Sequence, residues 1–181
     1  MRIGLLTGAR GAAIELHSLI QEVVQAEEDG FDSIWIPQVS SGSGFDALTV
    51  LSLVASKTSR IPVGTAVVPI FPIHPMVLAK HALTAQIASE GRMTLGVGLS
   101  HRPMIEDVMG LSYESPARHM EEYLNVLRPL LDDGKVDFQG QFFNVKAQFQ
   151  VPGALHVPVV IAALAPMMLR IAGQPARSDR R

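Results

Sequence analysis

The chain has 181 residues, which is enough for one domain with a substantial core. Hydrophobic residues make up 48% and charged residues 18%, with a formal net charge of −2, so nothing favours a nucleic-acid partner or an anionic membrane surface. The absence of cysteine excludes disulfides, thiolate metal sites and a cysteine nucleophile, and it fits a reducing cytoplasm. No apolar run reaches the roughly 18 residues that a membrane span needs.

Short apolar runs alternate with segments of helical periodicity along the chain. In chain order we expect a strand at 2–7, a helix at 16–29, a strand at 31–36, a helix at 47–59, a strand at 63–68, a helix at 75–90, a strand at 94–97, a helix at 116–131, a strand at 157–162 and a short helix from 166. This order predicts a parallel α/β sheet with right-handed crossovers.

Two segments depart from this alternation. Residues 136–145 read as a small hairpin that turns near Gly140. Residues 174–181 are polar and contain a proline, so we expect a disordered tail. A closed (β/α)₈ barrel takes about 250 residues. We therefore expect an incomplete TIM-type barrel with roughly the first five βα units, in a domain covering residues 1–173 and followed by the tail.

The strand at 63–68 locates a candidate site. It is short, rich in β-branched residues, and runs directly into a proline-rich loop that ends at His74 and Pro75. Such a run is typical of a buried parallel strand. In parallel α/β proteins, the loops at the carboxyl ends of strands hold the ligands. The sequence therefore predicts a ligand site beyond residue 68.

Five segments in this order resemble the luciferase-like monooxygenase superfamily, and most closely its branch of oxidoreductases that use the deazaflavin coenzyme F420. They are FDSIWIPQ (31–38), VGTAVVPIFPIHP (63–75), GRMTLGVGLSH (91–101), ESPARHMEEYLNVLRPLL (114–131) and VPVVIAALAPMMLRIAG (157–173). The resemblance implies hydride transfer between F420 and a small-molecule substrate, a cytoplasmic location and a homodimer. Family members continue into further barrel strands, so we expect an N-terminal portion produced by a frameshift or a premature stop.

The resemblance also implies site residues. In the family, the third strand carries a non-prolyl cis peptide in a bulge against the cofactor ring, which we place between Ala66 and Val67. Residue chemistry alone favours an ordinary trans bond there, because cis bonds outside proline are rare. Leu99 and Ser100 match cofactor-contacting positions.

His101 matches a position that holds an acid/base carboxylate in some relatives, so it is the candidate proton donor or acceptor. The alternative is a solvated loop histidine with no catalytic role. The glycines at 96 and 98 would let the backbone approach a planar ring closely. They do not form the dinucleotide fingerprint, because His101 stands at its last position.

Further contacts are implied on two other loops. Gln38 matches an acidic cofactor contact of sugar-phosphate-oxidising relatives, and Val39 replaces their catalytic histidine, which argues against that reaction and leaves reduction of an activated double bond. The turn after the fifth strand is used by the family for the cofactor, and its backbone N–H groups open a helix. The matching residues are Ala163, Leu164, Ala165 and Met167.

Two other functions remain open from the sequence. An FMN-dependent monooxygenase of the same superfamily would use oxygen instead of F420. A truncated remnant without activity would expose unpaired strand edges and self-associate. We expect no metal site: the acidic run at Glu27 to Asp29 reads as a solvated helix end, and no His/Asp/Glu group has ligand spacing.

Overall fold

The computed structural model describes residues 1–8, 15–39 and 44–173. The strands are β1 (Gly4–Leu6), β2 (Ser33–Ile36), β3 (Val63–Thr65), β4 (Val68–Pro69), β5 (Met93–Gly98), β6 (Lys135–Gln139), β7 (Asn144–Gln148) and β8 (Val159–Ile161). The helices are α1 (Leu16–Glu28), α2 (Ala47–Ala55), α3 (Pro75–Ala88), the π-helix η1 (Met104–Val108), α4 (Pro116–Asp132) and α5 (Pro166–Ala172). The predicted tail at 174–181 lies outside the described residues.

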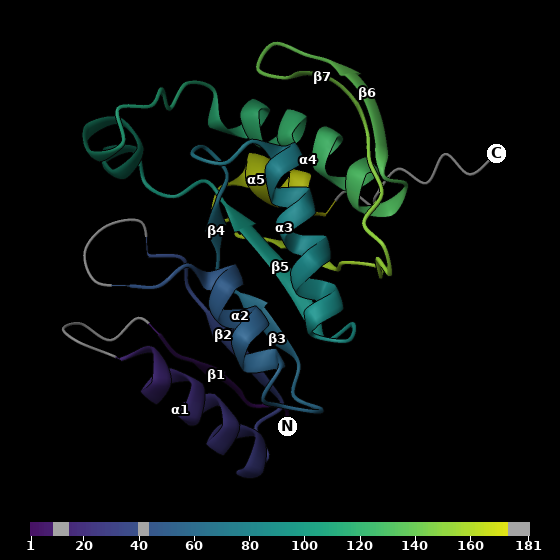
Figure 1. Cartoon of the computed structure of the whole chain (residues 1–181). Helices are drawn as coiled ribbons and strands as arrows, with labels where there is room; N and C mark the ends of the chain where they lie inside the picture. Colours follow the sequence, from purple (N-terminus) through teal and green to yellow (C-terminus); the bar gives the residue numbers. More distant parts are fainter. Residues whose placement is uncertain (9–14, 40–43, 174–181) are drawn as a thin grey trace.

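All strands except the hairpin β6–β7 form one parallel sheet, as predicted (Figure 1). β1 pairs with β2, β2 with β3, and β3 with β5, while β8 pairs with β5 as well. Each helix α1 to α5 follows a strand of this sheet. The chain therefore has the five βα units of an incomplete TIM-type barrel.

β3 and β4 are two parts of one strand that is interrupted by a bulge. Gly64 pairs with Thr94, but Val68 pairs with Val97, so four residues of this strand cover the length of three on β5. An extra residue of this kind bends a strand and interrupts its hydrogen-bond ladder. The β-branched run by itself predicts one continuous strand here, whereas the family resemblance implies a bulge at Ala66 and Val67, which the structure confirms.

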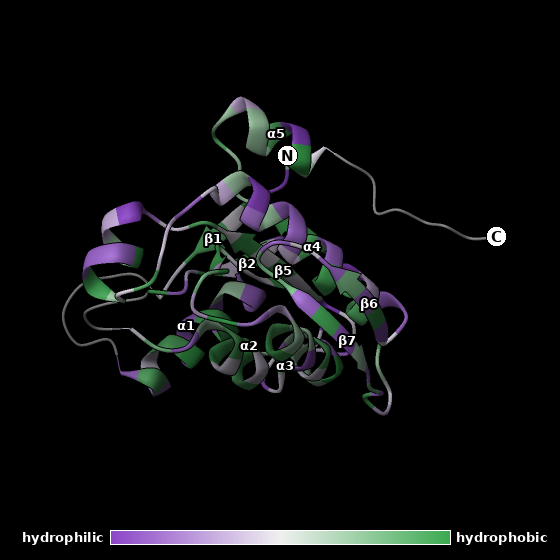
Figure 2. Ribbon diagram, turned by 90° about the horizontal axis from the view of Figure 1, so that it is seen from above, coloured by the Kyte–Doolittle hydropathy of each residue, from purple (hydrophilic) through white to green (hydrophobic). Residues whose placement is uncertain are grey.

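The helices cover one face of the sheet. Figure 2 shows α1, α2 and α3 in a row on one side of the strands, with α4 and then α5 continuing around the outside of the curved sheet. Side chains that alternate along the strands, such as Ile34, Val63 and Leu95, point into this layer and are buried. The opposite face is open: Leu6 is 59% exposed and Val160 is 43% exposed.

Helix boundaries follow the capping residues. Asp46 caps α2 by accepting the Thr49 N–H at 2.8 Å, as predicted. α2 ends at Ala55, not near 59, because the following residues leave the helix to bond elsewhere: the N–H of Ser59 donates to the Glu27 carboxylate at 3.0 Å. His74 caps α3, with its Nδ1 accepting the Met76 N–H at 3.2 Å.

The hairpin is confirmed and lies beside α4 (Figure 1). The buried Glu122 of α4 accepts the N–H groups of Phe142 at 2.7 Å and Gln141 at 3.1 Å, and it pairs with Arg118 at 3.1 Å. Burial acts to raise the pKa of Glu122, but these hydrogen bonds outweigh it and hold the pKa below its ordinary value. The carboxylate therefore fastens the turn of the hairpin to the helix.

Candidate functional site at the carboxyl ends of the strands

The carboxyl ends of four strands meet around the bulge. The Ala66 N–H donates to the carbonyl of Ile36 at the end of β2, at 2.9 Å. The Ala162 N–H, just after β8, donates to the carbonyl of Val97 at 2.9 Å. These bonds bring the segments after β2, β3, β5 and β8 to one edge of the sheet, where the sequence predicts the site.

The peptide bond between Ala66 and Val67 is cis, which confirms what the family resemblance implies. Thr65 spans the gap that the bulge leaves in the ladder. Its buried hydroxyl donates to the Gly96 carbonyl at 2.8 Å and accepts the Gly96 N–H at 2.7 Å. The Thr65 hydroxyl thus replaces the backbone hydrogen bonds that are missing between the two strands. Both Ala66 and Val67 remain partly exposed.

The two glycines of β5 lie directly against the bulge. A Cβ at Gly96 would collide with the carbonyl oxygen of Thr65, and one at Gly98 would come within 2.6 Å of a Val67 methyl. Sequence reasoning assigns these glycines to cofactor approach. The structure adds a second reason for them, because the bulge itself occupies the space that a side chain would need.

The loop after β5 turns sharply at its predicted contact residues. Ser100 has a left-handed φ of 63°, and its carbonyl accepts the Tyr113 hydroxyl at 3.3 Å. His101 follows with an exposed side chain, and its own carbonyl accepts the N–H of Ile105 at the start of η1. The geometry therefore leaves the imidazole accessible beside the partly buried Leu99 and Ser100.

An aromatic cluster that the sequence analysis does not predict forms one wall of this edge. Phe71 stacks between Tyr113, with ring centroids 4.9 Å apart, and His119, at 4.3 Å. Phe142 and Phe143 at the hairpin turn each lie 5.0 Å from the His119 ring. The five side chains come from four separate segments, so no periodicity marks them; the adjacent phenylalanines near a predicted turn are the one available signal.

Burial sets the ionisation of this cluster. It lowers the pKa of His119, with the Glu122 carboxylate acting in the opposite direction, and within the described residues the Nε2 of His119 has no hydrogen-bond partner. Burial also raises the pKa of Tyr113, against the influence of Arg102, whose guanidinium lies 5.0 Å from the ring centre. The wall is therefore neutral and apolar near neutral pH.

The remaining predicted contacts divide into two groups. Gln38 lies at the end of β2, but its Oε1 accepts the Ala47 N–H at 2.8 Å, so its oxygen serves the start of α2. Ala163 packs on the core next to the site. Leu164 is 99% exposed, and Ala165 and Met167 are exposed as well. The helix α5 that follows is too short, at seven residues, to make an anion site by itself.

Glu27 is not the solvated helix end that the sequence suggests. Its carboxylate accepts the N–H groups of Ser59, Arg60 and Ile61, the last two at 2.8 Å. Burial acts to raise the pKa of Glu27, but these backbone bonds outweigh it and lower the pKa. Across the described ranges, no three His, Asp or Glu side chains gather closely enough to hold a metal ion. None of the helices described there combines the length and apolar character needed to cross a bilayer.

Comparison with known sequences identifies the family to which the chain is similar. Residues 1–177 match the family model described as luciferase-like monooxygenase. The chain is 30% identical over 167 residues to the F420-dependent glucose-6-phosphate dehydrogenase of Amycolatopsis mediterranei, covering 86% of this chain and 50% of that protein. The chain spans about half the length of the curated relatives that it matches.

Solved structures give the same picture of the fold. The coenzyme F420-dependent tetrahydromethanopterin reductase of Methanopyrus kandleri has a TM-score of 0.78 and 25% identity, over 96% of this chain and 53% of that one. The oxygenating component of the 3,6-diketocamphane monooxygenase of Pseudomonas putida, in complex with FMN, has a TM-score of 0.75 and 17% identity, over 89% of this chain and 51% of that one. The second likeness concerns the fold alone.

Proposed function

Because the chain belongs to the luciferase-like monooxygenase family, we propose that its bulged edge binds the ring of deazaflavin F420 and serves hydride transfer to a small organic substrate. The observation that carries the proposal is the bulge at Ala66 and Val67, which packs on the buried Gly96 and Gly98 and leaves both of its residues partly exposed at the carboxyl edge of the sheet. Ala66 and Val67 have small side chains, so a flat ring can approach this surface.

The residues present suit such a ring. Gly98 adds no side chain, and Ala66 and Ala162 add only a methyl each, while Val67 supplies an apolar contact against Gly98. The aromatic wall around Phe71 is neutral and close by. A flat, largely apolar ring meets a complementary surface here, and F420, when bound, supplies a hydride donor or acceptor.

Residues of this chain would position the cofactor ring and exchange a proton with the substrate. Leu99 and Ser100 border the ring surface, where the Tyr113 hydroxyl fixes the turn at Ser100. His101 is accessible and would supply or remove a proton at an imidazole nitrogen, the general acid–base role that histidine side chains most often fill. Gln38 contributes the amide nitrogen that its bond to Ala47 leaves unused.

FMN is the second candidate cofactor. The observation in its favour is the same backbone arrangement in the Pseudomonas putida monooxygenase that holds FMN. Three observations favour F420 over it: the identity of 30% to the Amycolatopsis mediterranei dehydrogenase, the 25% to the Methanopyrus kandleri reductase, and the resemblance of five ordered segments to the F420 branch. A non-catalytic remnant is the third candidate, favoured by the open face at Leu6 and Val160.

Titration of the 181-residue chain with F420 and with FMN, followed by fluorescence and equilibrium dialysis, tests the proposal. We expect saturable binding of F420 and weaker binding of FMN. Tight binding of FMN alone would assign the chain to the monooxygenases. If the folded chain binds neither cofactor, the remnant remains. We further propose a cytoplasmic location and a homodimer. Size-exclusion chromatography with light scattering checks the homodimer, and cell fractionation checks the location.

A further inference from the structure

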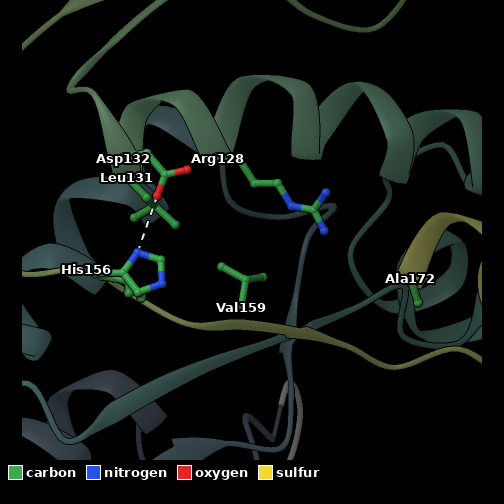
Figure 3. Close-up of a pocket in the computed structure, with 7 residues that line it drawn as sticks. Arg128, Leu131, Asp132, His156, Val159 and Ala172 are labelled. Atoms are coloured by element: carbon green, nitrogen blue, oxygen red, sulfur yellow. Dashed lines mark ion pairs between the residues drawn. The ribbon is translucent and has the colours of Figure 1, made fainter. Parts of the chain in front are cut away.

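A pocket lies at the opposite end of the strands from Gly98 and His101. It has a volume of about 300 Å³ and is lined by the C-terminal turn of α4, the segment leading into β8, and the end of α5 (Figure 3). Its lining residues are Arg128, Leu131, Asp132, His156, Val157, Val159 and Ala172. Its lining combines three charged or titratable side chains with four apolar ones, and its volume is at the lower end of the range of small-molecule sites.

Arg128 and Asp132 stand one helical turn apart on α4, a spacing at which opposite charges commonly pair. Here Asp132 instead meets His156, whose Nδ1 lies 3.5 Å from the carboxylate oxygen. Figure 3 shows the Arg128 side chain extending away from Asp132, over Val159. Within the residues described, Arg128 has no ion-pair partner. Arg128 is partly buried and lines the pocket, so its guanidinium is available to donate N–H groups to a ligand there.

We propose that this pocket binds a small organic monocarboxylate with a short apolar chain. The planar guanidinium of Arg128 matches the two oxygens of a carboxylate and can bind both. Leu131, Val157 and Val159 give the chain an apolar wall. The Asp132 carboxylate on the same lining disfavours a dianion such as phosphate, so a ligand with a single negative charge fits the electrostatics best.

Butyrate is a suitable probe, because it has one carboxylate and a three-carbon chain. We expect saturable shifts of backbone amide signals near Arg128 and Val159 in nitrogen-15 spectra of the whole chain, with a Kd on the order of 1 mM. Butyramide, which has the same shape without the charge, and inorganic phosphate should each bind at least about tenfold more weakly. Equal binding of butyrate and butyramide would overturn the proposal, as would the absence of saturable butyrate binding.

Two variants test the pocket itself. Arg128→Gln should raise the Kd for butyrate at least about tenfold. Arg170→Gln, on the exposed surface of α5, is the matched control and should leave the Kd unchanged. Ala172→Phe should also abolish binding by filling the pocket while Arg128 remains. Amide spectra without butyrate show whether each variant is folded. Unchanged affinity in a folded Arg128→Gln variant would contradict the assignment, whatever the outcome of the F420 titration.

Discussion

The two ends of the parallel sheet are held together by different chemistry. At the amino ends of the strands, charged and amide side chains bond directly to the main chain of neighbouring elements. Arg92 donates to the carbonyls of Ala55, Ile61 and Thr58 at 2.9 to 3.1 Å, and Glu27 accepts three N–H groups. At the carboxyl ends, a bulge, two glycines and stacked aromatic rings hold neighbouring elements together by close packing.

The difference separates residues that stabilise the sheet from the edge where we propose that the cofactor binds. The polar bonds at the amino ends saturate the main chain there and tie α1, α2 and β5 to the entry of β3. The carboxyl ends are packed closely at the backbone, yet they leave Ala66, Val67, Ser100 and His101 accessible. This division is the one expected of a TIM-type barrel, whose active site lies at the carboxyl ends of the strands.

The largest effect should come from Gly96→Ala. The added methyl collides with the Thr65 carbonyl, which is main chain and cannot rotate away. We expect a loss of about 3 kcal/mol in the free energy of unfolding, measured by urea denaturation. Gly173→Ala, where a Cβ meets nothing closer than 3.4 Å, is the control. Equal stability of the two variants would show that the bulge is not rigidly packed.

Arg92→Ala should come next. It removes the donors to three carbonyls and to the Thr58 hydroxyl at the end of α2. Leaving these groups without partners should lower the free energy of unfolding by about 2 kcal/mol. Binding of F420 by the folded fraction should stay unchanged, because the residue lies at the far end of the strands. A stable variant with weakened F420 binding would reverse the division between the two ends.

Glu27→Gln should cost about 1 kcal/mol at neutral pH, because an amide accepts the three N–H bonds less strongly than a carboxylate. Glu28→Gln, its exposed neighbour, should have little effect. The pKa of Glu27 is lowered in the folded state from its ordinary 4.5. The stabilisation of the folded state by the Glu27 carboxylate is therefore complete above that value, and it disappears as the pH falls through the folded-state pKa. A difference in unfolding free energy between wild type and variant that grows on acidification would contradict this account.

The smallest effect should be local, at the hairpin. Glu122→Gln weakens the bonds to Gln141 and Phe142, so the amides of 135–148 should exchange with solvent about fivefold faster. Glu121→Gln, one position earlier and exposed, is the matched control. Since the pKa of Glu122 is also lowered, wild-type protection should fall in the same way as acid protonates this carboxylate. Equal exchange rates of these amides in the two variants would show that Glu122 does not hold the hairpin.

Much of the fold follows from local sequence. The strand–helix alternation predicts the parallel sheet, Asp46 marks the start of α2, and Pro75 and Pro116 mark the first residues of α3 and α4. These features are readable because hydrophobic periodicity and capping depend on neighbours in the chain. The end of α2 cannot be read from local sequence, because the residues that follow the helix bond to Glu27 and Arg92, which are distant in the chain.

The site is only partly readable for the same reason. The cis bond at Ala66 follows from family resemblance and not from residue chemistry, which favours trans. The cofactor contacts and the role of His101 stay predictions. The aromatic wall joins Phe71, Tyr113 and His119 with the hairpin turn, and only the tertiary structure brings these segments together.

We propose above all that the carboxyl ends of the strands bind the flat cofactor ring, and that Glu27 and Arg92 at the amino ends stabilise the sheet without contacting that ring. The most direct measurement is mapping of amide chemical shifts in the nitrogen-15-labelled chain during addition of F420. We predict saturable shifts at Ala66, Gly98, Ser100 and Ala163, with Glu27 and Arg92 unchanged. Shifts confined to the amino ends, or none at any F420 concentration in a folded sample, would contradict the account.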